Sequence, residues 1–261
     1  MPKRIDFYYF SGTGNTQIIV DYAVNSLAVN GYNISLKHID KGYSVSDNEP
    51  AEELWLAFPV NSQAVSSFIW SFFKSLPESS GTKVYVIATL NNSAYILEPL
   101  YTLLKNKGYA PTSTCEISMP NNMSDDAHQD KEDDLRKLIA ASVKVNTFVS
   151  HAVAGDATWA SKYKGSAFVS FLSRRTVLPW ISMRFLLKLR TDASKCTGCG
   201  LCVRQCPSQN ISMTALPPVH GSKCEFCMKC AAYCPKKAVF ISGKPKIKFR
   251  SSRIPHSTIQ H

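Results

Sequence analysis

Cys196-Thr-Gly-Cys-Gly-Leu-Cys-Val-Arg-Gln-Cys-Pro207 is a run of four cysteines that ends in proline, and Cys224-Glu-Phe-Cys-Met-Lys-Cys-Ala-Ala-Tyr-Cys-Pro235 repeats its spacing. Each run has the form C-x₂-C-x₂-C-x₃-C-P, which is typical of iron–sulfur ligation. Three cysteines separated by two residues each let one loop wrap three corners of a cubane. The two runs therefore predict two [4Fe–4S] clusters inside a small α+β domain.

The fourth cysteine of each run cannot comfortably reach the same cubane, and in two-cluster ferredoxins it ligates the other cluster. The predicted ligand sets are therefore crossed: Cys196, Cys199, Cys202 and Cys234 for cluster 1, and Cys224, Cys227, Cys230 and Cys206 for cluster 2. Zinc is the alternative, because C-x₂-C pairs also form zinc ribbons. Zinc does not explain two complete runs that each end in Cys-Pro, so we favour iron–sulfur clusters.

The first 150 residues alternate between segments with strand character and segments with helical spacing. Strand-like runs occur at residues 4–10, 33–38, 54–60, 84–90 and 109–118. Helical patterns occur at residues 16–30, 65–76, 94–107 and 130–149. This alternation favours a parallel sheet that is covered on both faces. The count and size predict a flavodoxin-like, doubly wound α/β fold with five strands and a ligand at their carboxyl ends.

A loop rich in glycine and hydroxyl groups follows the first predicted strand and opens the first predicted helix. It contains Ser11, Gly12, Thr13, Gly14, Asn15 and Thr16. Backbone N–H groups in such a turn, together with the helix N-terminus, form an anion cradle, and hydroxyl groups can donate to phosphate oxygens. The loop has no lysine, which argues against a P-loop nucleotidase. We call residues 10–16 the phosphate loop and expect FMN there; the alternative is a glycine turn without a ligand.

Charge is unevenly distributed along the 261 residues. Residues 1–150 contain 12 Lys and Arg against 16 Asp and Glu, residues 151–190 contain 7 against 1, and residues 191–261 contain 11 against 2. A basic C-terminal half invites a nucleic-acid hypothesis. Thiolate-bound clusters are negatively charged, however, and part of the basic excess can serve as their counter-charge. We therefore expect no nucleic-acid partner.

Composition divides the chain into four parts. We expect a flavodoxin-like domain over residues 1–150, a basic amphipathic linker over 151–190, the two-cluster domain over 191–242 and a basic, mobile tail over 243–261. For the linker we favour helices that pack between the domains. The alternative is a basic surface that makes peripheral contact with a membrane or with a partner.

The nine cysteines also bear on the compartment. Eight of them lie at metal-ligand spacing and no signal peptide precedes them, which favours a reducing cytoplasm. The ninth, Cys115, lies in a predicted strand and is expected to be buried. No run of 18 apolar residues predicts a membrane-spanning helix.

The order of the parts resembles a known family. Residues 11–16 are similar to the FMN-phosphate loop of flavodoxins, and a flavodoxin-like domain followed by a two-cluster domain resembles the EFR-family ferredoxins over nearly the whole chain. Phe58-Pro-Val60, Met119-Pro-Asn-Asn122 and Asn210-Ile211 support this resemblance. It implies flavin-ring loops near 59–63 and 119–124, a further loop at 89–93, and redox partner proteins. The ring-loop residues that it implies are Pro59, Val60, Asn61, Asn91, Asn92, Pro120, Asn121 and Asn122.

The chain departs from the family where aromatic side chains commonly stack on the flavin. It has Asn61 in the first ring loop and Met123 in the second. Our leading hypothesis is an electron-transfer protein that passes electrons between two clusters and FMN. One alternative is a ferredoxin whose flavodoxin-like domain lacks flavin and docks a redox partner; another is a flavin-dependent reductase of a small substrate. No residue is identifiable as a general acid or base, so the sequence leaves open whether the chain is an enzyme.

Overall fold

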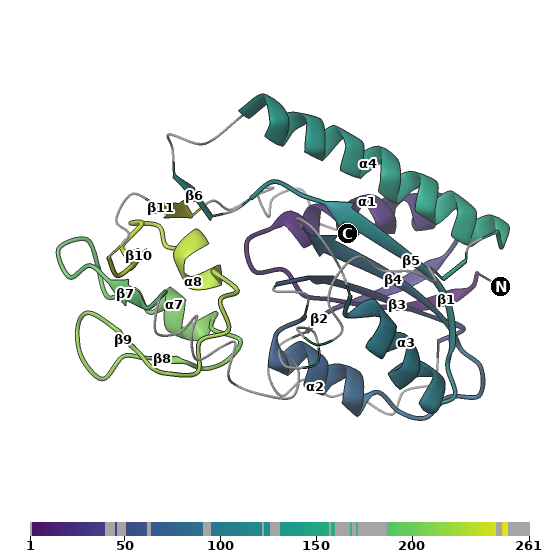
Figure 1. Cartoon of the computed structure of the whole chain (residues 1–261), viewed down its shortest axis with the longest axis horizontal. Coiled ribbons are helices and arrows are strands. Elements are labelled where there is room, and N and C mark those ends of the chain that lie inside the picture. Colours follow the sequence, from purple (N-terminus) through teal and green to yellow (C-terminus); the bar gives the residue numbers. More distant parts are fainter. Residues whose placement is uncertain are drawn as a thin grey trace.

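The computed structural model describes residues 2–39, 45, 51–61, 64–90, 95–121, 123–125, 131–156, 158–159, 168, 171, 187–243 and 247–249. Two units lie side by side in Figure 1. We call residues 2–156 the flavodoxin-like unit and residues 187–243 the cysteine-rich unit.

The flavodoxin-like unit is built on one parallel five-stranded sheet. Its strands are β1 (Arg4–Tyr9), β2 (Asn33–His38), β3 (Glu53–Pro59), β4 (Lys83–Leu90) and β5 (Ala110–Ser118), in the order β2-β1-β3-β4-β5. This is the flavodoxin-like strand order, whose switch point lies between the first and third strands. The predicted sheet and fold class are confirmed.

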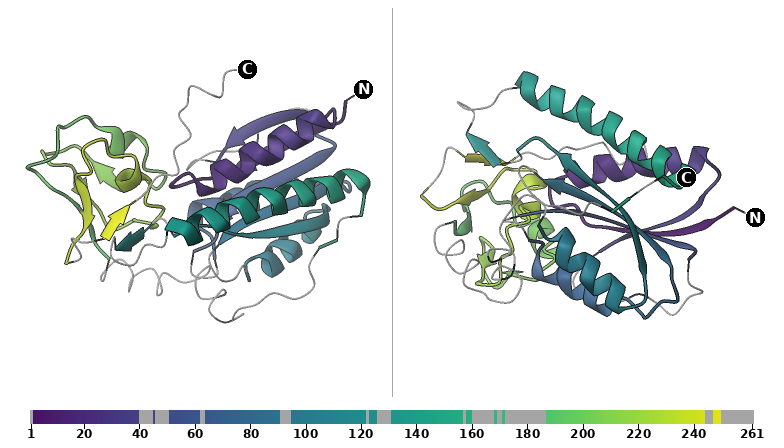
Figure 2. Two further views of the ribbon diagram at one scale, coloured as in Figure 1. Left: turned by 90° about the horizontal axis from the view of Figure 1, so that it is seen from above. Right: turned by 45° about the vertical axis from the view of Figure 1, so that its right-hand side comes forward.

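Helices cover both faces of the sheet. The helices α1 (Asn15–Val29) and α4 (Lys131–Ala154) lie on one face, and α2 (Ser67–Ser75) and α3 (Leu97–Asn106) lie on the other (Figures 1 and 2). All four predicted helices are present, and α4 continues past its predicted end at residue 149. Because both faces are covered, β3 and β4 are buried over most of their length, which explains their continuous apolar sequence.

Aromatic packing fills both layers. On one face Trp55 stacks on Tyr85, with ring centroids 4.7 Å apart; on the other Phe58 meets Phe73 at 5.2 Å. Cys115, on β5, is buried as predicted, and burial raises the pKa of its thiol to about 11. This cysteine is therefore a packing residue rather than a ligand.

The cysteine-rich unit has two small antiparallel strand pairs and two single-turn helices. The strands β7 (Leu189–Thr191) and β10 (Val239–Ile241) form one pair, and β8 (Ile211–Ser212) and β9 (Val219–His220) form the other. The helices are α7 (Leu201–Arg204) and α8 (Lys229–Ala232). The strand β7 begins inside the segment that we expected to be linker, because it supplies the partner for β10.

Two further short strands pair with each other although they lie far apart in the sequence. The strand β11 (Ile247–Phe249) pairs antiparallel with β6 (Met123–Asp125), which follows the second predicted ring loop. We expected residues 243–261 to be a mobile tail, and the part after Gly243 that the structure describes is instead a paired strand. Its register pairs Ile247 with Asp125, Lys248 with Ser124 and Phe249 with Met123.

Most of the linker lies outside the described residues, so neither hypothesis for it is tested. Within the described ranges, no helix is long and apolar enough to cross a membrane.

Candidate functional site

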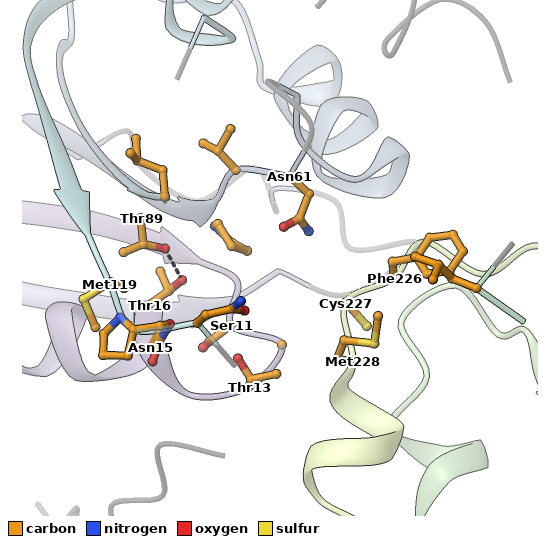
Figure 3. Close-up of a pocket in the computed structure, with 17 residues that line it drawn as sticks. Ser11, Thr13, Asn15, Thr16, Asn61, Thr89, Met119, Phe226, Cys227 and Met228 are labelled. Atoms are coloured by element: carbon orange, nitrogen blue, oxygen red, sulfur yellow. Dashed lines mark hydrogen bonds between the residues drawn. The ribbon is translucent and has the colours of Figure 1, made fainter. Parts of the chain in front are cut away.

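A cavity of about 340 Å³ lies at the carboxyl ends of β1, β3, β4 and β5, and the cysteine-rich unit closes one side of it (Figure 3). We call it the interdomain cavity. It is lined by Ser11, Gly12, Thr13, Asn15, Thr16, Pro59, Val60, Asn61, Thr89, Leu90, Met119, Pro120, Asn121, Leu187, Phe226, Cys227 and Met228.

Most of the predicted flavin-site residues meet at this cavity. Ten of them line it: Ser11, Gly12, Thr13, Asn15, Thr16, Pro59, Val60, Asn61, Pro120 and Asn121. Gly14 instead shapes the loop, and Asn91, Asn92 and Asn122 lie outside the described residues. Thr89, Leu90 and Met119 also line the cavity; they lie in the predicted loops at 89–93 and 119–124 but were not among the predicted site residues. All four lining residues from 187 onward lie outside the predicted flavin site.

The phosphate loop is held in a closed shape by its own backbone. Gly14 has a φ of 107°, a conformation that glycine adopts without a steric penalty, and α1 begins at the next residue. The N–H of Gly14 donates to Ser11 Oγ at 3.1 Å. Asn15 Nδ2 donates to the carbonyl of Pro120 at 2.8 Å, which ties this loop to the second ring loop.

Thr16 joins α1 to β4. Its hydroxyl lies 2.7 Å from Thr89 Oγ1, and Thr89 Oγ1 also lies 3.4 Å from the carbonyl oxygen of Phe58. Thr16 lines the cavity, and its donation to a phosphate stays a prediction. Ser11 and Thr13 are buried in the loop and are the other predicted hydroxyl donors to phosphate.

The cavity suits a phosphate monoester. Among the described residues that line it, none carries a charged side chain. The N-terminus of α1 contributes partial positive charge, which favours an anion at the phosphate loop. A volume of about 340 Å³ lies within the range of small-molecule sites, roughly 300–1,000 Å³. The residues present therefore fit FMN.

The cysteines of the first predicted set surround one small cavity in the cysteine-rich unit. Its lining includes Cys196, Cys199, Cys202 and Cys234. The last of these belongs to the second run, so the fold brings it to the three cysteines of the first. This placement agrees with the crossed ligand set.

The second set is also gathered. Burial raises the pKa of Cys230 well above its usual value, and the neighbouring thiols of Cys227, Cys224 and Cys206, together with Cys202 of the first set, raise it further. Burial likewise raises the pKa of Cys227 to about 12. Packing buried and half-buried thiols together disfavours their thiolate forms, whereas a cationic iron centre stabilises them. The donor set therefore fits a thiolate-bound metal cluster.

Backbone N–H groups donate to sulfur at equivalent places in the two runs. Asn210 N donates to Cys206 Sγ at 3.2 Å, and Ala238 N donates to Cys234 Sγ at 3.3 Å. Both donors lie four residues after the cysteine, beyond the Cys-Pro step. Such donors stabilise thiolate and influence the potential of a bound cluster.

We call Cys196–Cys202 the first cysteine loop and Cys224–Cys230 the second. The second loop lies directly against the phosphate loop. A Cβ atom placed on Gly12 would lie 2.0 Å from the carbonyl oxygen of Cys227, so only glycine allows this approach. Cys227 also lines the interdomain cavity. A predicted cluster ligand and a predicted phosphate loop therefore share one cavity.

A buried carboxylate fixes this contact. The backbone N–H of Ser67, the first residue of α2, donates to Glu225 Oε2 at 2.5 Å, and the Ser67 hydroxyl donates to Glu225 Oε1. A carboxylate at a helix N-terminus satisfies unpaired N–H groups and is favoured by the helix dipole. Beside it, Lys229 Nζ lies 5.9 Å from the centroid of the Phe10 ring.

The two cysteine loops have the same backbone conformation but different side chains. The left-handed positions are Gly198 and Gly200 in the first loop, with φ of 69° and 71°, and Phe226 and Met228 in the second, with φ of 52° and 58°. A left-handed conformation costs a residue with a side chain roughly 1–2 kcal/mol. The second loop therefore carries backbone strain that glycine would avoid.

Both units are similar to known proteins. Residues 195–238 match the family described as a 4Fe-4S dicluster domain. Oxidised flavodoxin 2 from Bacillus cereus is 17% identical over 58% of this chain and 97% of that chain, with a TM-score of 0.45. Flavodoxins from Streptococcus pneumonia TIGR4 and Megasphaera elsdenii are 15% and 19% identical, over 55% and 54% of this chain and 98% of each of theirs, with TM-scores of 0.40 and 0.39. No curated protein sequence matches the chain.

The family match supports at least one 4Fe–4S cluster in the cysteine-rich unit. The strand order independently gives the other unit its flavodoxin-like fold. This combination supports an electron-transfer role, and electron-transfer iron–sulfur proteins act with redox partner proteins.

Proposed function

We propose that the chain passes electrons between two [4Fe–4S] clusters and an FMN bound in the interdomain cavity. One observation carries the proposal: Cys227, a predicted ligand of cluster 2, lines the same cavity as the phosphate loop. The contact between Gly12 and the Cys227 backbone leaves no room for a side chain between them. Two redox groups held on either side of this contact would be close enough to exchange electrons.

The two ligand sets differ in exposure, and this difference suggests the order in which electrons would pass through the chain. Cys199, in the proposed set for cluster 1, is exposed, whereas Cys230, in the proposed set for cluster 2, is buried. A partner protein would therefore meet cluster 1, and cluster 2 would relay electrons to the cavity. The crossed ligand sets are part of this proposal, and the gathering of Cys234 with the first set supports them.

The flavodoxin-like unit would hold the flavin through its three loops. The phosphate loop, with the buried hydroxyls of Ser11 and Thr13, would bind the phosphate. Asn61 and the backbone at Pro120 and Asn121 would meet the ring. When bound, FMN supplies the exchange between one-electron and two-electron transfer that the clusters alone lack.

We propose further that the chain is an EFR-family protein that works with redox partner proteins in a reducing cytoplasm. The order of the two units supports the family, and eight cysteines at metal-ligand spacing suit the compartment.

Anaerobic purification tests the proposal. We expect about eight irons, about eight inorganic sulfides and one FMN per chain, measured by iron and sulfide assays and by flavin release with acid. Eight irons without FMN, even after reconstitution, would refute the flavin half and favour a docking role for the flavodoxin-like unit. Zinc without sulfide would refute the whole proposal.

A further inference from the structure

We propose that the flavin pocket is composite and that Phe226 and Met228 of the second cysteine loop form the wall that the flavodoxin-like loops lack. This inference rests on the proposed function. It assigns part of the flavin site to the cysteine-rich unit, more than a hundred residues from the phosphate loop. It also gives the second cysteine loop a task in addition to cluster ligation.

The first argument comes from the backbone. The first cysteine loop wraps its predicted cluster with glycine at both left-handed positions, so cluster ligation does not require a side chain there. The second loop keeps the same conformation at Phe226 and Met228 despite the strain. Because glycine suffices at the equivalent positions of the first loop, predicted cluster ligation does not explain why the second loop has side chains at these two positions. The location of the two side chains must therefore supply the explanation.

The second argument is their location. Phe226 and Met228 are 5% and 8% exposed, and both line the interdomain cavity. Figure 3 shows Cys227 and Met228 across the cavity from Ser11 and Thr13, with Asn61 at its upper edge. No residue from β1, β3, β4 or β5, or from the described loops after them, brings an aromatic ring to this cavity. Phe226 is therefore the aromatic residue in its described lining: its ring packs in the core of the cysteine-rich unit, and Met228 lies closer to the phosphate loop (Figure 3).

The third argument is that the wall is held in place. Both side chains also pack in the core of the cysteine-rich unit, where Leu189 and Ile211 are buried. The preceding residue, Glu225, is bonded to the start of α2. An apolar wall that is anchored on both sides can cover a flavin face without being ordered by it, and a methionine or aromatic side chain suits that surface.

The affinity of the chain for FMN tests the inference. Protein that keeps its iron but has been stripped of flavin is titrated with FMN, and the quenching of flavin fluorescence gives Kd. Met228→Gly relieves the strain and removes the wall, so we expect Kd to rise about tenfold or more, because the flavin then buries less apolar surface. Phe226→Gly should act in the same direction, and Met228→Leu should retain near-normal affinity.

Gln209 and Lys237 provide matched controls. Both are exposed, both have a left-handed φ (50° and 48°), and neither lines the cavity. Gln209→Gly and Lys237→Gly relieve the same kind of strain and should leave Kd unchanged. If Met228→Gly loses iron, Met228→Asn replaces it, because asparagine tolerates the left-handed conformation but supplies no apolar wall.

The outcomes separate this inference from the proposed function. If the wild-type chain does not bind FMN, the proposed function fails. If it binds FMN and the iron-loaded Met228 and Phe226 variants bind it equally tightly, the composite pocket is refuted and both residues serve only the core. A rise in Kd confined to these variants supports the inference.

Discussion

The two cysteine loops share their spacing and backbone, yet they face different surroundings. The first loop places Cys199 and its neighbour Gly198 at the surface. In the second loop Glu225, Phe226 and Met228 are buried, and each residue from 225 to 229 contacts the flavodoxin-like unit or lines the cavity beside it. The same motif therefore occurs twice, once at the surface and once against the flavodoxin-like unit.

This difference teaches that the residues between the cysteines of a repeated motif can distinguish two otherwise identical ligand loops. The cysteines alone would make the two proposed clusters equivalent. The residues between them decide which cluster faces outward and which faces the cavity. Four predictions test this contrast, and they are ordered from the largest expected effect to the smallest.

Loss of one cluster tests whether each cysteine loop takes its fourth ligand from the other run. Cys206→Ser should remove about half of the iron, because the proposed cluster 2 then keeps only three of its four thiolate ligands. The electron paramagnetic resonance spectrum of the reduced variant should match that of Cys224→Ser. A spectrum that matches Cys196→Ser instead would show that Cys206 serves the loop of its own run.

Gly12→Ala tests the contact between the phosphate loop and the second cysteine loop. A Cβ atom would lie 2.0 Å from a backbone oxygen, so the two units must move apart, at an expected cost of about 1–3 kcal/mol in unfolding free energy. Thermal unfolding and the rate of FMN reduction measured by stopped-flow absorbance both report on it.

The control for Gly12 is Gly31→Ala. Gly31 has a φ of 80° with open space around its Cα, so alanine strains the backbone without touching the other unit. It should lower stability but leave the reduction rate unchanged. Unaltered FMN reduction in Gly12→Ala would contradict the role of this contact.

Glu225→Gln tests the carboxylate that joins the units. Glutamine keeps the shape but loses the charge that the N-terminus of α2 favours, so we expect a loss of about 1–2 kcal/mol in urea unfolding of the iron-loaded protein. Glu98, exposed in the first turn of α3, is the matched control for a carboxylate near a helix start within one unit. Equal effects of Glu225→Gln and Glu98→Gln would argue against a special interdomain role.

Lys229→Met should have the smallest effect. The substitution keeps an apolar stem but removes the cation near the Phe10 ring, worth about 0.5–1 kcal/mol at such a site. Lys229→Arg should retain the interaction. Urea midpoints that do not differ between the two variants would show that this cation contributes nothing to the contact between the units.

Local patterns predicted most of the fold. The five strands and four helices follow from runs such as residues 54–60, where buried strands read as continuous apolar sequence. The phosphate loop could be predicted because Gly12 and Gly14 mark a turn between a strand and a helix. Long-range pairing could not be predicted in this way: the bond between Ser67 and Glu225 spans 158 residues.

The site was predictable only on the flavodoxin-like side. Phe226 and Met228 reach the cavity because the two units pack against each other. Contacts between units produce no repeating apolar pattern in the sequence, unlike strands and helices. One signal was available, however. The second run has Phe and Met where the first has Gly198 and Gly200, and unequal residues at equivalent positions of a repeat indicate unequal surroundings.

The pairing of β6 with β11 sets an order for building the molecule. The strand β6 lies just after Pro120 and Asn121, but its partner is synthesised more than a hundred residues later, after both cysteine runs. During translation the N-terminal part of a chain emerges and folds first. The strand β6 therefore pairs with β11 only after the cysteine-rich unit has been synthesised, so the flavodoxin-like unit cannot be completed before the cysteine-rich unit has been made.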